Sequence, residues 1–233
     1  MILRLFIYLG YLSVISIPST YAADDWCIAD PTHPPCNGAP GICTINSNGS
    51  QGGFVANTAT VESVMVSGLS HNSPHIGLEV SICDQVRVTD RAFITDHAVV
   101  GDHVQVSGDA WIYEDARVTG DVSVSGTAQI YENAWVFGNA RVSGAAQIYG
   151  NSWVSGDAQV YGSARISGTS YVFKSAQVYG SARVSGNSWV SGDSQLYGTA
   201  RIYGNAQITG DAQVFGVAQM SGNDFFSTGN YEF

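Results

Sequence analysis

Charged side chains are scarce in this sequence, and basic ones are the scarcest. Only 12% of the 233 residues are charged, with nine Lys and Arg against nineteen Asp and Glu, so the net charge is −10. Lys174 is the only lysine. Nucleic-acid binding needs clustered basic side chains to contact phosphates. The balance of charge therefore predicts no nucleic-acid partner.

Long apolar runs are also lacking. The longest, residues 5–17, is shorter than the ~20 residues that a membrane-spanning helix needs. It follows Arg4 and precedes Pro18 and a small-residue stretch that ends at Ala23, which is typical of a secretory signal peptide. We expect residues 1–23 to be a signal peptide. The mature protein is expected to be secreted or otherwise extracytoplasmic, in the periplasm or outside the cell, and not membrane-spanning.

Cysteine is rare and confined to one part of the chain. All four cysteines lie in or beside a Pro- and Gly-rich stretch, residues 24–75, and they are Cys27, Cys36, Cys43 and Cys83. In an exported chain the default is two disulfides, whose pairing the sequence leaves open. A zinc site is the alternative, but the spacings match no familiar paired motif. We predict a small disulfide-bonded N-terminal cap, with no metal and no cofactor.

Glycine and small residues are plentiful, and they belong to a six-residue unit. Twenty-five consecutive units run without insertion from Ile76 to the unit that starts at Met220. Residues 154–159, Val-Ser-Gly-Asp-Ala-Gln, are a typical unit. The aliphatic first position and the small fifth position are the two that can point inward. A fixed short period of this kind predicts an all-β, single-stranded β-solenoid.

A second period of eighteen residues runs through the solvent-facing positions, which predicts three strands per coil. Trp135, Trp153, Tyr171 and Trp189 are eighteen apart, and so are Gln159, Gln177, Gln195 and Gln213. Neighbouring coils would lie ~4.8 Å apart, so residues eighteen apart would stack as cross-strand pairs do. Gly, Asn and Asp recur at the corners, where positive φ angles are needed.

The repeat also predicts the ends of the solenoid. It covers residues 76–223, and open ends of a solenoid need caps. Residues 224–233 abandon the unit and contain four aromatic residues, Phe225, Phe226, Tyr231 and Phe233. We expect this segment to be a C-terminal cap folded over the last coil.

The V-S-G-N-A-R-V-Y-G-D-A-Q sequence pattern of residues 76–223 resembles the YdcK-like bacterial β-solenoid repeats, relatives of the hexapeptide-repeat proteins. The resemblance implies a left-handed, triangular β-helix. The general preference for right-handed crossovers between parallel strands argues the other way, so the handedness follows from the resemblance alone.

The same resemblance raises an enzymatic alternative. Hexapeptide-repeat acyltransferases are generally homotrimers with a catalytic histidine between subunits, and this chain offers His97 and His103. The two histidines take the fourth position of successive units and so lie on different corners, where they cannot converge within one monomer. The sequence shows no nucleophile, protruding loop or partner carboxylate beside them. An inter-subunit histidine site is the second hypothesis.

One predicted face is rich in aromatic residues, and these are the candidate ligand-binding residues: Trp135, Phe137, Trp153, Tyr171, Phe173 and Trp189. The rings could simply stiffen the parallel strands. They could bind a polysaccharide, whose C–H faces stack on rings, or bury themselves against a cell-surface protein or a second copy of the chain. Ice binding is disfavoured, because ranks of Thr are missing.

A column of Arg165, Arg183 and Arg201 forms a stripe of like charges. Nearby Asp side chains and salt could offset it, which would make it a solvated stripe, and an anion-binding stripe is the alternative. Taken together, the sequence predicts a secreted, non-enzymatic structural or adhesive module. It would present aromatic and Gln ladders to a polysaccharide or protein surface.

Overall fold

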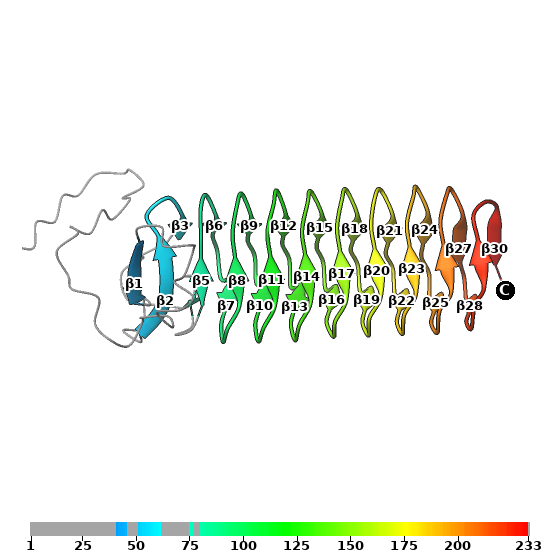
Figure 1. Ribbon diagram of the computed structural model, residues 1–233, viewed down its shortest axis with the longest axis horizontal. Coiled ribbons are helices and arrows are strands. Elements are labelled where there is room, and N and C mark those ends of the chain that lie inside the picture. The colour runs from blue at the N-terminus through cyan, green and yellow to red at the C-terminus, as the bar shows by residue number, and fades with distance from the viewer. Residues whose placement is uncertain (1–40, 46–50, 62–74, 77–79, 233) are drawn as a thin grey trace, which may run out of the picture.

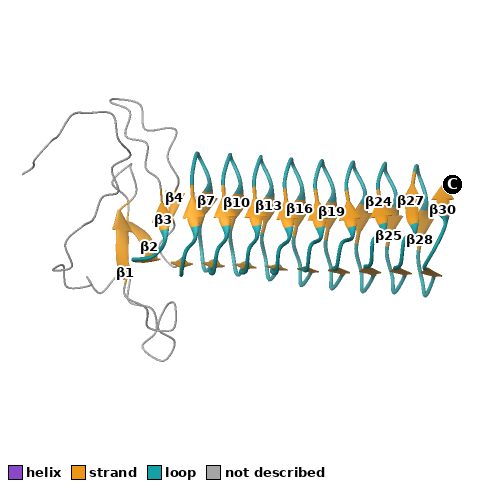
Figure 2. Cartoon of the chain, turned by 90° about the horizontal axis from the view of Figure 1, so that it is seen from above, coloured by secondary structure: helices purple, strands orange, loops and turns teal. Residues whose placement is uncertain are grey.

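The molecule is a straight prism of stacked coils, seen side-on in Figure 1 and from above in Figure 2. The computed structural model describes residues 41–45, 51–61, 75–76 and 80–232. Within those ranges every regular element is a β-strand and none is a helix, so the described residues contain no helix that could span a membrane. The expected all-β solenoid is confirmed.

Each coil contributes one strand to each of three sheets, here named A, B and C. Sheet A contains β1 (Gly41–Ile45), β2 (Gln51–Ala56), β5 (Ser81–Ile82), β8 (Val99–Val100), β11 (Arg117–Val118), β14 (Trp135–Val136), β17 (Trp153–Val154), β20 (Tyr171–Val172), β23 (Trp189–Val190), β26 (Gln207–Ile208) and β29 (Phe225–Phe226). Sheet B contains β3 (Thr60–Val61), β6 (Arg87–Val88), β9 (Gln105–Val106), β12 (Ser123–Val124), β15 (Arg141–Val142), β18 (Gln159–Val160), β21 (Gln177–Val178), β24 (Gln195–Leu196), β27 (Gln213–Phe215) and β30 (Asn230–Glu232). Sheet C contains β4 (His75–Ile76), β7 (Phe93–Ile94), β10 (Trp111–Ile112), β13 (Gln129–Ile130), β16 (Gln147–Ile148), β19 (Arg165–Ile166), β22 (Arg183–Val184), β25 (Arg201–Ile202) and β28 (Gln219–Met220).

The strand register confirms the eighteen-residue coil. Trp135 pairs with Trp153 in parallel register, and Gln159 pairs with Gln177 in the same way on sheet B. The backbone N–H of Trp135 donates to the carbonyl oxygen of Ser152 at 2.9 Å, and the same bond recurs from coil to coil. Side chains eighteen residues apart therefore lie one above the other. The left-handed sense implied by the resemblance stays a prediction.

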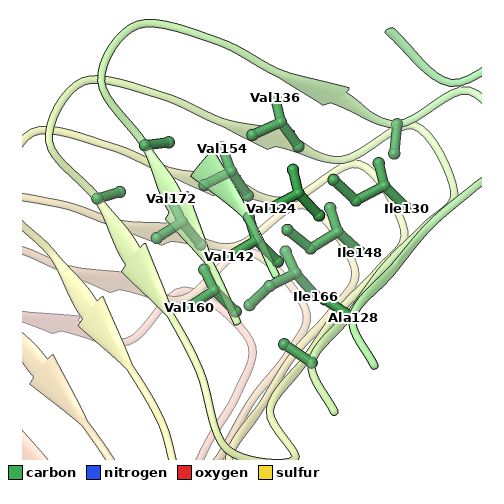
Figure 3. Packing of buried hydrophobic residues seen from close by; sticks show 14 of the residues in the cluster. Val124, Ala128, Ile130, Val136, Val142, Ile148, Val154, Val160, Ile166 and Val172 are labelled. Atoms are coloured by element: carbon green, nitrogen blue, oxygen red, sulfur yellow. The ribbon is translucent and has the colours of Figure 1, made fainter. Parts of the chain in front are cut away.

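The core is a narrow column of aliphatic and small side chains, as the unit predicted. First-position residues such as Val136, Val154 and Val172 are fully buried and stack along sheet A, with the Ile130, Ile148 and Ile166 column facing them in Figure 3. The fifth position holds mostly buried Ala, and Ser in four units: Ser152, Ser170, Ser188 and Ser194. The first three donate their hydroxyl protons to a backbone carbonyl three residues earlier, at 2.7–2.8 Å. These three buried hydroxyls are thereby satisfied without a second polar side chain, whereas the Ser194 hydroxyl makes no hydrogen bond.

The corners require a left-handed backbone at the third position of each unit. Most coils place Gly there, and the early coils place Asp or Glu at φ of 56–61°. The early carboxylates also accept a backbone N–H from the next coil, at 2.7 Å between Asp102 and Gly120 and at 2.8 Å between Glu114 and Glu132. These residues therefore link coils as well as turn the chain, a role that the repeat alone did not indicate.

The solenoid starts earlier than residue 76, the expected boundary with the N-terminal region. Strands β2 and β3 already pair in parallel with β5 and β6. Val61 pairs with Val88, twenty-seven residues later, whereas Ile76 pairs with Ile94, eighteen later. The segment between Val61 and Ile76 is nine residues longer than its counterparts, which hid this coil from a six-residue search.

Cysteine pairing remains a prediction. Cys83 lies in the corner after β5, is 7% exposed and is disulfide-bonded. Cys27 and Cys36 lie outside the described residues, as does the expected signal peptide, and nothing is described of the Cys43 side chain. A disulfide-bonded cap is therefore still the expectation from composition.

The C-terminal segment differs from the expected cap, because it continues the solenoid instead of folding over it. Strands β29 and β30 add to sheets A and B in parallel register. The final coil is one residue short, since Val214 pairs with Tyr231, seventeen residues on. Phe226 and Tyr231 take inward positions and pack against the core, with ring centroids 4.3 Å apart. Two large, partly buried rings therefore stand where earlier coils have aliphatic side chains.

Candidate functional site

The six candidate binding residues all lie on sheet A or at the position just after its strands. We call them the aromatic face: Trp135, Phe137, Trp153, Tyr171, Phe173 and Trp189. The tryptophans and Tyr171 take the outward position of β14, β17, β20 and β23, since the next residue of each strand is buried in the core. The structure brings all six together in four successive coils.

The rings of the aromatic face pack edge to face. Trp135 and Trp153 have centroids 5.0 Å apart and planes at 68°, and Trp153 and Tyr171 are 5.6 Å apart at 60°. Tyr171 and Trp189 are 5.2 Å apart at 51°. Aromatic quadrupoles favour such tilted contacts. The face is therefore corrugated, with ring planes that change direction from coil to coil.

Alternation between Phe and Ser creates a larger repeat within the face. The position after each strand is Phe137, Ser155, Phe173 and Ser191 in turn. Phe137 meets Trp153 with centroids 6.0 Å apart at 79°, and Phe173 meets Trp189 at 6.0 Å and 78°. The same Phe–Trp unit thus occurs twice, two coils apart.

The solvent exposure of the outward rings also repeats every two coils. Trp153 and Trp189 are 37% and 45% exposed, whereas Trp135 and Tyr171 are less accessible. Two coils correspond to about 10 Å along the prism. The face therefore offers two equivalent exposed indoles with that separation. The Phe–Ser alternation was visible in the sequence and could have revealed the spacing.

Two other aromatic ladders have a different geometry, which indicates a structural role. Tyr161, Tyr179, Tyr197 and Phe215 stack beside sheet B with centroids 4.8–5.0 Å apart and planes within 7° of parallel. Tyr113, Tyr131 and Tyr149 stack in the same way beside sheet C. Each ring covers the face of its neighbour, so these ladders offer mainly ring edges to a partner.

Stacking also changes the acidity of these tyrosines. Burial, and after it the adjacent Tyr131 and nearby carboxylates such as Glu114, together raise the pKa of Tyr113 to about 12. Burial likewise raises the pKa of Tyr131, Tyr161 and Tyr179. A phenolate inside a stack would lose hydration and would meet its neighbours' negative charge.

We expect the free energy of unfolding to fall as the pH rises from about 10 toward about 12. In this window the unfolded chain ionises tyrosines that the folded chain keeps neutral, so the unfolded state binds fewer protons and gains stability with pH. Urea unfolding across this range, with tyrosinate absorbance followed in parallel, measures the effect. Tyr113→Phe should make the slope shallower. A free energy of unfolding independent of pH above 10 would contradict the stacking argument.

His97 and His103 lie on different corners, one between β7 and β8 and the other between β8 and β9. Each has a carboxylate partner that was not anticipated: His97 Nδ1 is 3.6 Å from Asp115, and His103 Nδ1 is 3.3 Å from Asp121. Both partners are eighteen residues later, so the coil period could have found them. The imidazoles are 63% and 60% exposed, and nothing in the described residues joins the two pairs into one site.

The arginine column lies on sheet C, where Arg183 is paired with Arg165 on one side and Arg201 on the other. All three side chains are exposed. The described residues contain no group of three or more His, Cys, Asp or Glu that could hold a metal ion. The aromatic face and the arginine column are two exposed surfaces of the described residues with the chemistry to recognise a ligand.

Comparison with known protein families identifies the type of the repeat. The model of the YdcK beta solenoid repeat matches residues 128–150, 146–162, 176–192 and 200–216. Neither a curated protein nor a solved structure matches the chain. The matched segments all lie in the regular three-sheet part of the prism and carry the six-residue unit with its inward first and fifth positions. The chain is therefore a parallel β-solenoid that contains repeats of the YdcK beta solenoid type.

Proposed function

We propose that the protein is an exported, non-enzymatic adhesive module that binds a polysaccharide through the aromatic face. The observation that carries this proposal is the pair of exposed indoles, Trp153 and Trp189, repeated with equivalent Phe contacts on a rigid sheet. Exposed clusters of large apolar side chains on a soluble protein commonly mark interaction sites. Export is supported by the apolar N-terminal run after Arg4.

The geometry favours an extended, regular ligand. Each indole is fixed by rings of neighbouring coils, so little side-chain entropy remains to be lost on binding. The two indoles lie about 10 Å apart along the prism axis. A polymer that presents an apolar sugar face at that repeat could contact both at once, which raises avidity without any further contact.

The test is a pull-down of the full mature protein on insoluble cellulose and chitin. Trp153→Ala combined with Trp189→Ala should weaken retention about thirty-fold or more, because removing one buried aromatic anchor costs on the order of 2 kcal/mol. The wild-type protein should be retained, and tryptophan fluorescence should change on addition of soluble oligosaccharides of the same polymer.

Trp111→Ala is the matched control, because Trp111 is 42% exposed and stacked on Phe93, but on sheet C. It should leave retention unchanged. Equal loss in both variants would show that the indoles act only through stability or non-specific adsorption. Failure of the wild-type protein to bind any polysaccharide, with self-association that Trp153→Ala and Trp189→Ala abolish, would assign the face to a second copy instead.

The second candidate is an acyltransferase-like homotrimer, and it is favoured by one observation, the carboxylate beside each histidine. A histidine oriented by a carboxylate is a common general base. Light scattering of the mature protein decides between the two. A stable trimer would support this candidate, with His97→Gln and His103→Gln abolishing acyl transfer. A monomer would leave the histidine–aspartate pairs as links between coils.

A further inference from the structure

In the C-terminal half of the prism, the acidic side chains and the arginine column lie on opposite sides. Between residues 133 and 223 the only carboxylates are those of Asp157, Asp193 and Asp211. All three lie on the edge between sheets A and B, for example Asp157 between β17 and β18. In a three-sided coil that edge is opposite sheet C, where Arg165 and its column lie.

No carboxylate of residues 133–223 therefore lies on the edges beside the arginine column, and the next carboxylates on those edges are Glu132 before the column and Asp224 after it. The two edges that border sheet C carry only neutral side chains in these coils, such as Ser181 and Thr199 on one side and Asn187 and Asn205 on the other. The described ion pairs involve other residues, Arg91 with Asp109 and the two histidines. The guanidinium groups of the column make no ion pair or side-chain hydrogen bond within the described part of the chain. No Asp side chain pairs directly with this stripe within the described residues.

Stacking like charges in register is unfavourable without a compensating partner. Arg165, Arg183 and Arg201 follow one another at the strand spacing of ~4.8 Å, and opposed like charges destabilise a sheet. The row is extended by Gln147 before it and Gln219 after it, which are further amide donors. The result is a straight row of five hydrogen-bond-donating side chains.

We propose that this row binds an acidic polysaccharide that lies along sheet C with its carboxylates facing the guanidinium groups. The planar guanidinium fork matches a carboxylate in bidentate geometry, and such charge-assisted pairs are strong. Repeated anions along one extended chain suit repeated guanidinium groups along one axis. This surface is distinct from the aromatic face and does not depend on it.

The side chains around the row favour a carbohydrate over a single-stranded nucleic acid. Binders of single strands combine a basic groove with aromatic platforms for the bases. Beside Arg165 and Arg183 the adjoining positions are Ser167 and Ser185, which can serve sugar hydroxyls but cannot stack on a base. The adjoining rings lie toward the ends of the row, Tyr149 beside Gln147 and Tyr203 beside Arg201.

The experiment measures binding of the full mature protein to immobilised polygalacturonate. Arg183→Gln should weaken binding about ten-fold, because it removes the central charge of the row. The substitution is conservative for folding, since Gln already takes this position at Gln129 and Gln147. Binding should weaken as salt is raised, and monomeric galacturonate should compete poorly.

Arg141→Gln is the matched control, because Arg141 is an exposed strand arginine on sheet B that stands between Ser123 and Gln159. It should change binding by less than about two-fold. Trp153→Ala with Trp189→Ala should leave polygalacturonate binding intact, which separates this surface from the aromatic face. Equal loss in Arg183→Gln and Arg141→Gln would overturn the proposal.

Two further results would assign the arginine row to a different ligand. Tighter binding of poly(dT) than of polygalacturonate through Arg183 would assign the row to nucleic acid. Self-association at low salt that Arg183→Gln abolishes would assign it to the acidic edge of a second copy. Absence of any polygalacturonate binding by the wild-type protein at low salt would also overturn the proposal.

Discussion

Deletion of the six residues 157–162 is expected to leave the solenoid folded but to abolish binding through the aromatic face. The deletion removes one unit and joins Gly156 to Ser163, a Gly-Ser corner of the kind that the chain already uses at residues 162–163. Every later residue keeps its inward or outward direction, because the unit length is preserved. Every later row nevertheless moves to the next face of the prism.

The shift divides the aromatic face. Trp153 would stay on sheet A and pair with Gln177, whereas Tyr171 and Trp189 would move to sheet C. Some ring contacts would be lost, each contributing about 0.5–1.5 kcal/mol, so the free energy of unfolding should fall by only about 2–4 kcal/mol. Retention on polysaccharide should fall about thirty-fold or more, the same loss that we expect when both indoles are removed.

Deletion of residues 103–108 is the matched control. It also removes one unit and joins a third-position residue, Asp102, to a fourth-position residue, Asp109. All six residues of the aromatic face lie after it, so they move to another sheet together and stay contiguous. Circular dichroism and chemical unfolding should show a folded β-protein in both variants, and only the control should bind. If the 157–162 deletion bound as tightly as the wild type, the aromatic face would not be the binding site.

The repeat period alone predicted most of the fold, because inward and outward directions depend only on local geometry. Residues such as Val154 and Ala158 had to point inward once the unit was recognised, and both are fully buried. The eighteen-residue rows followed from three units per coil. Membership of the aromatic face could therefore be predicted residue by residue.

Ring orientation could not be predicted in the same way, because it depends on the volumes of neighbouring rows. Tyr161 and Tyr179 stack within 2° of parallel, whereas Trp135 and Trp153 meet at 68° in rows with the same period. Phe137 contacts both Trp135 and Trp153, whereas the next coil has the small Ser155 at that position. The two exposed indoles are a consequence of this packing.

The ends of the solenoid were missed for a related reason. A search by period recognises coils of standard length, and both terminal coils depart from it, one by nine extra residues before Ile76 and one by a missing residue before Tyr231. Parallel hydrogen bonding tolerates such changes at the corners as long as each strand keeps its register. The strands β2, β3, β29 and β30 therefore belong to the solenoid despite their irregular spacing.

Gly168→Ala is expected to destabilise the protein by about 2–3 kcal/mol. Gly168 has φ of +71°, and a Cβ built there would lie 2.7 Å from the backbone nitrogen and 2.8 Å from the backbone oxygen of Gly186 in the next coil. Gly186 cannot move away easily, because its own carbonyl oxygen accepts the N–H of Thr169 at 2.7 Å. Left-handed strain and a backbone clash therefore add together.

Gly222→Ala isolates the conformational part of that cost. Gly222 belongs to the same corner column and has φ of +60°, but no atom lies within 4 Å of the Cβ that would be added. Its loss should be about 1 kcal/mol, the cost of a left-handed non-glycine residue. Chemical unfolding of both variants gives the difference between them, which is the contribution of close coil stacking. Equal destabilisation would mean that the coils separate at the corner to admit a methyl group.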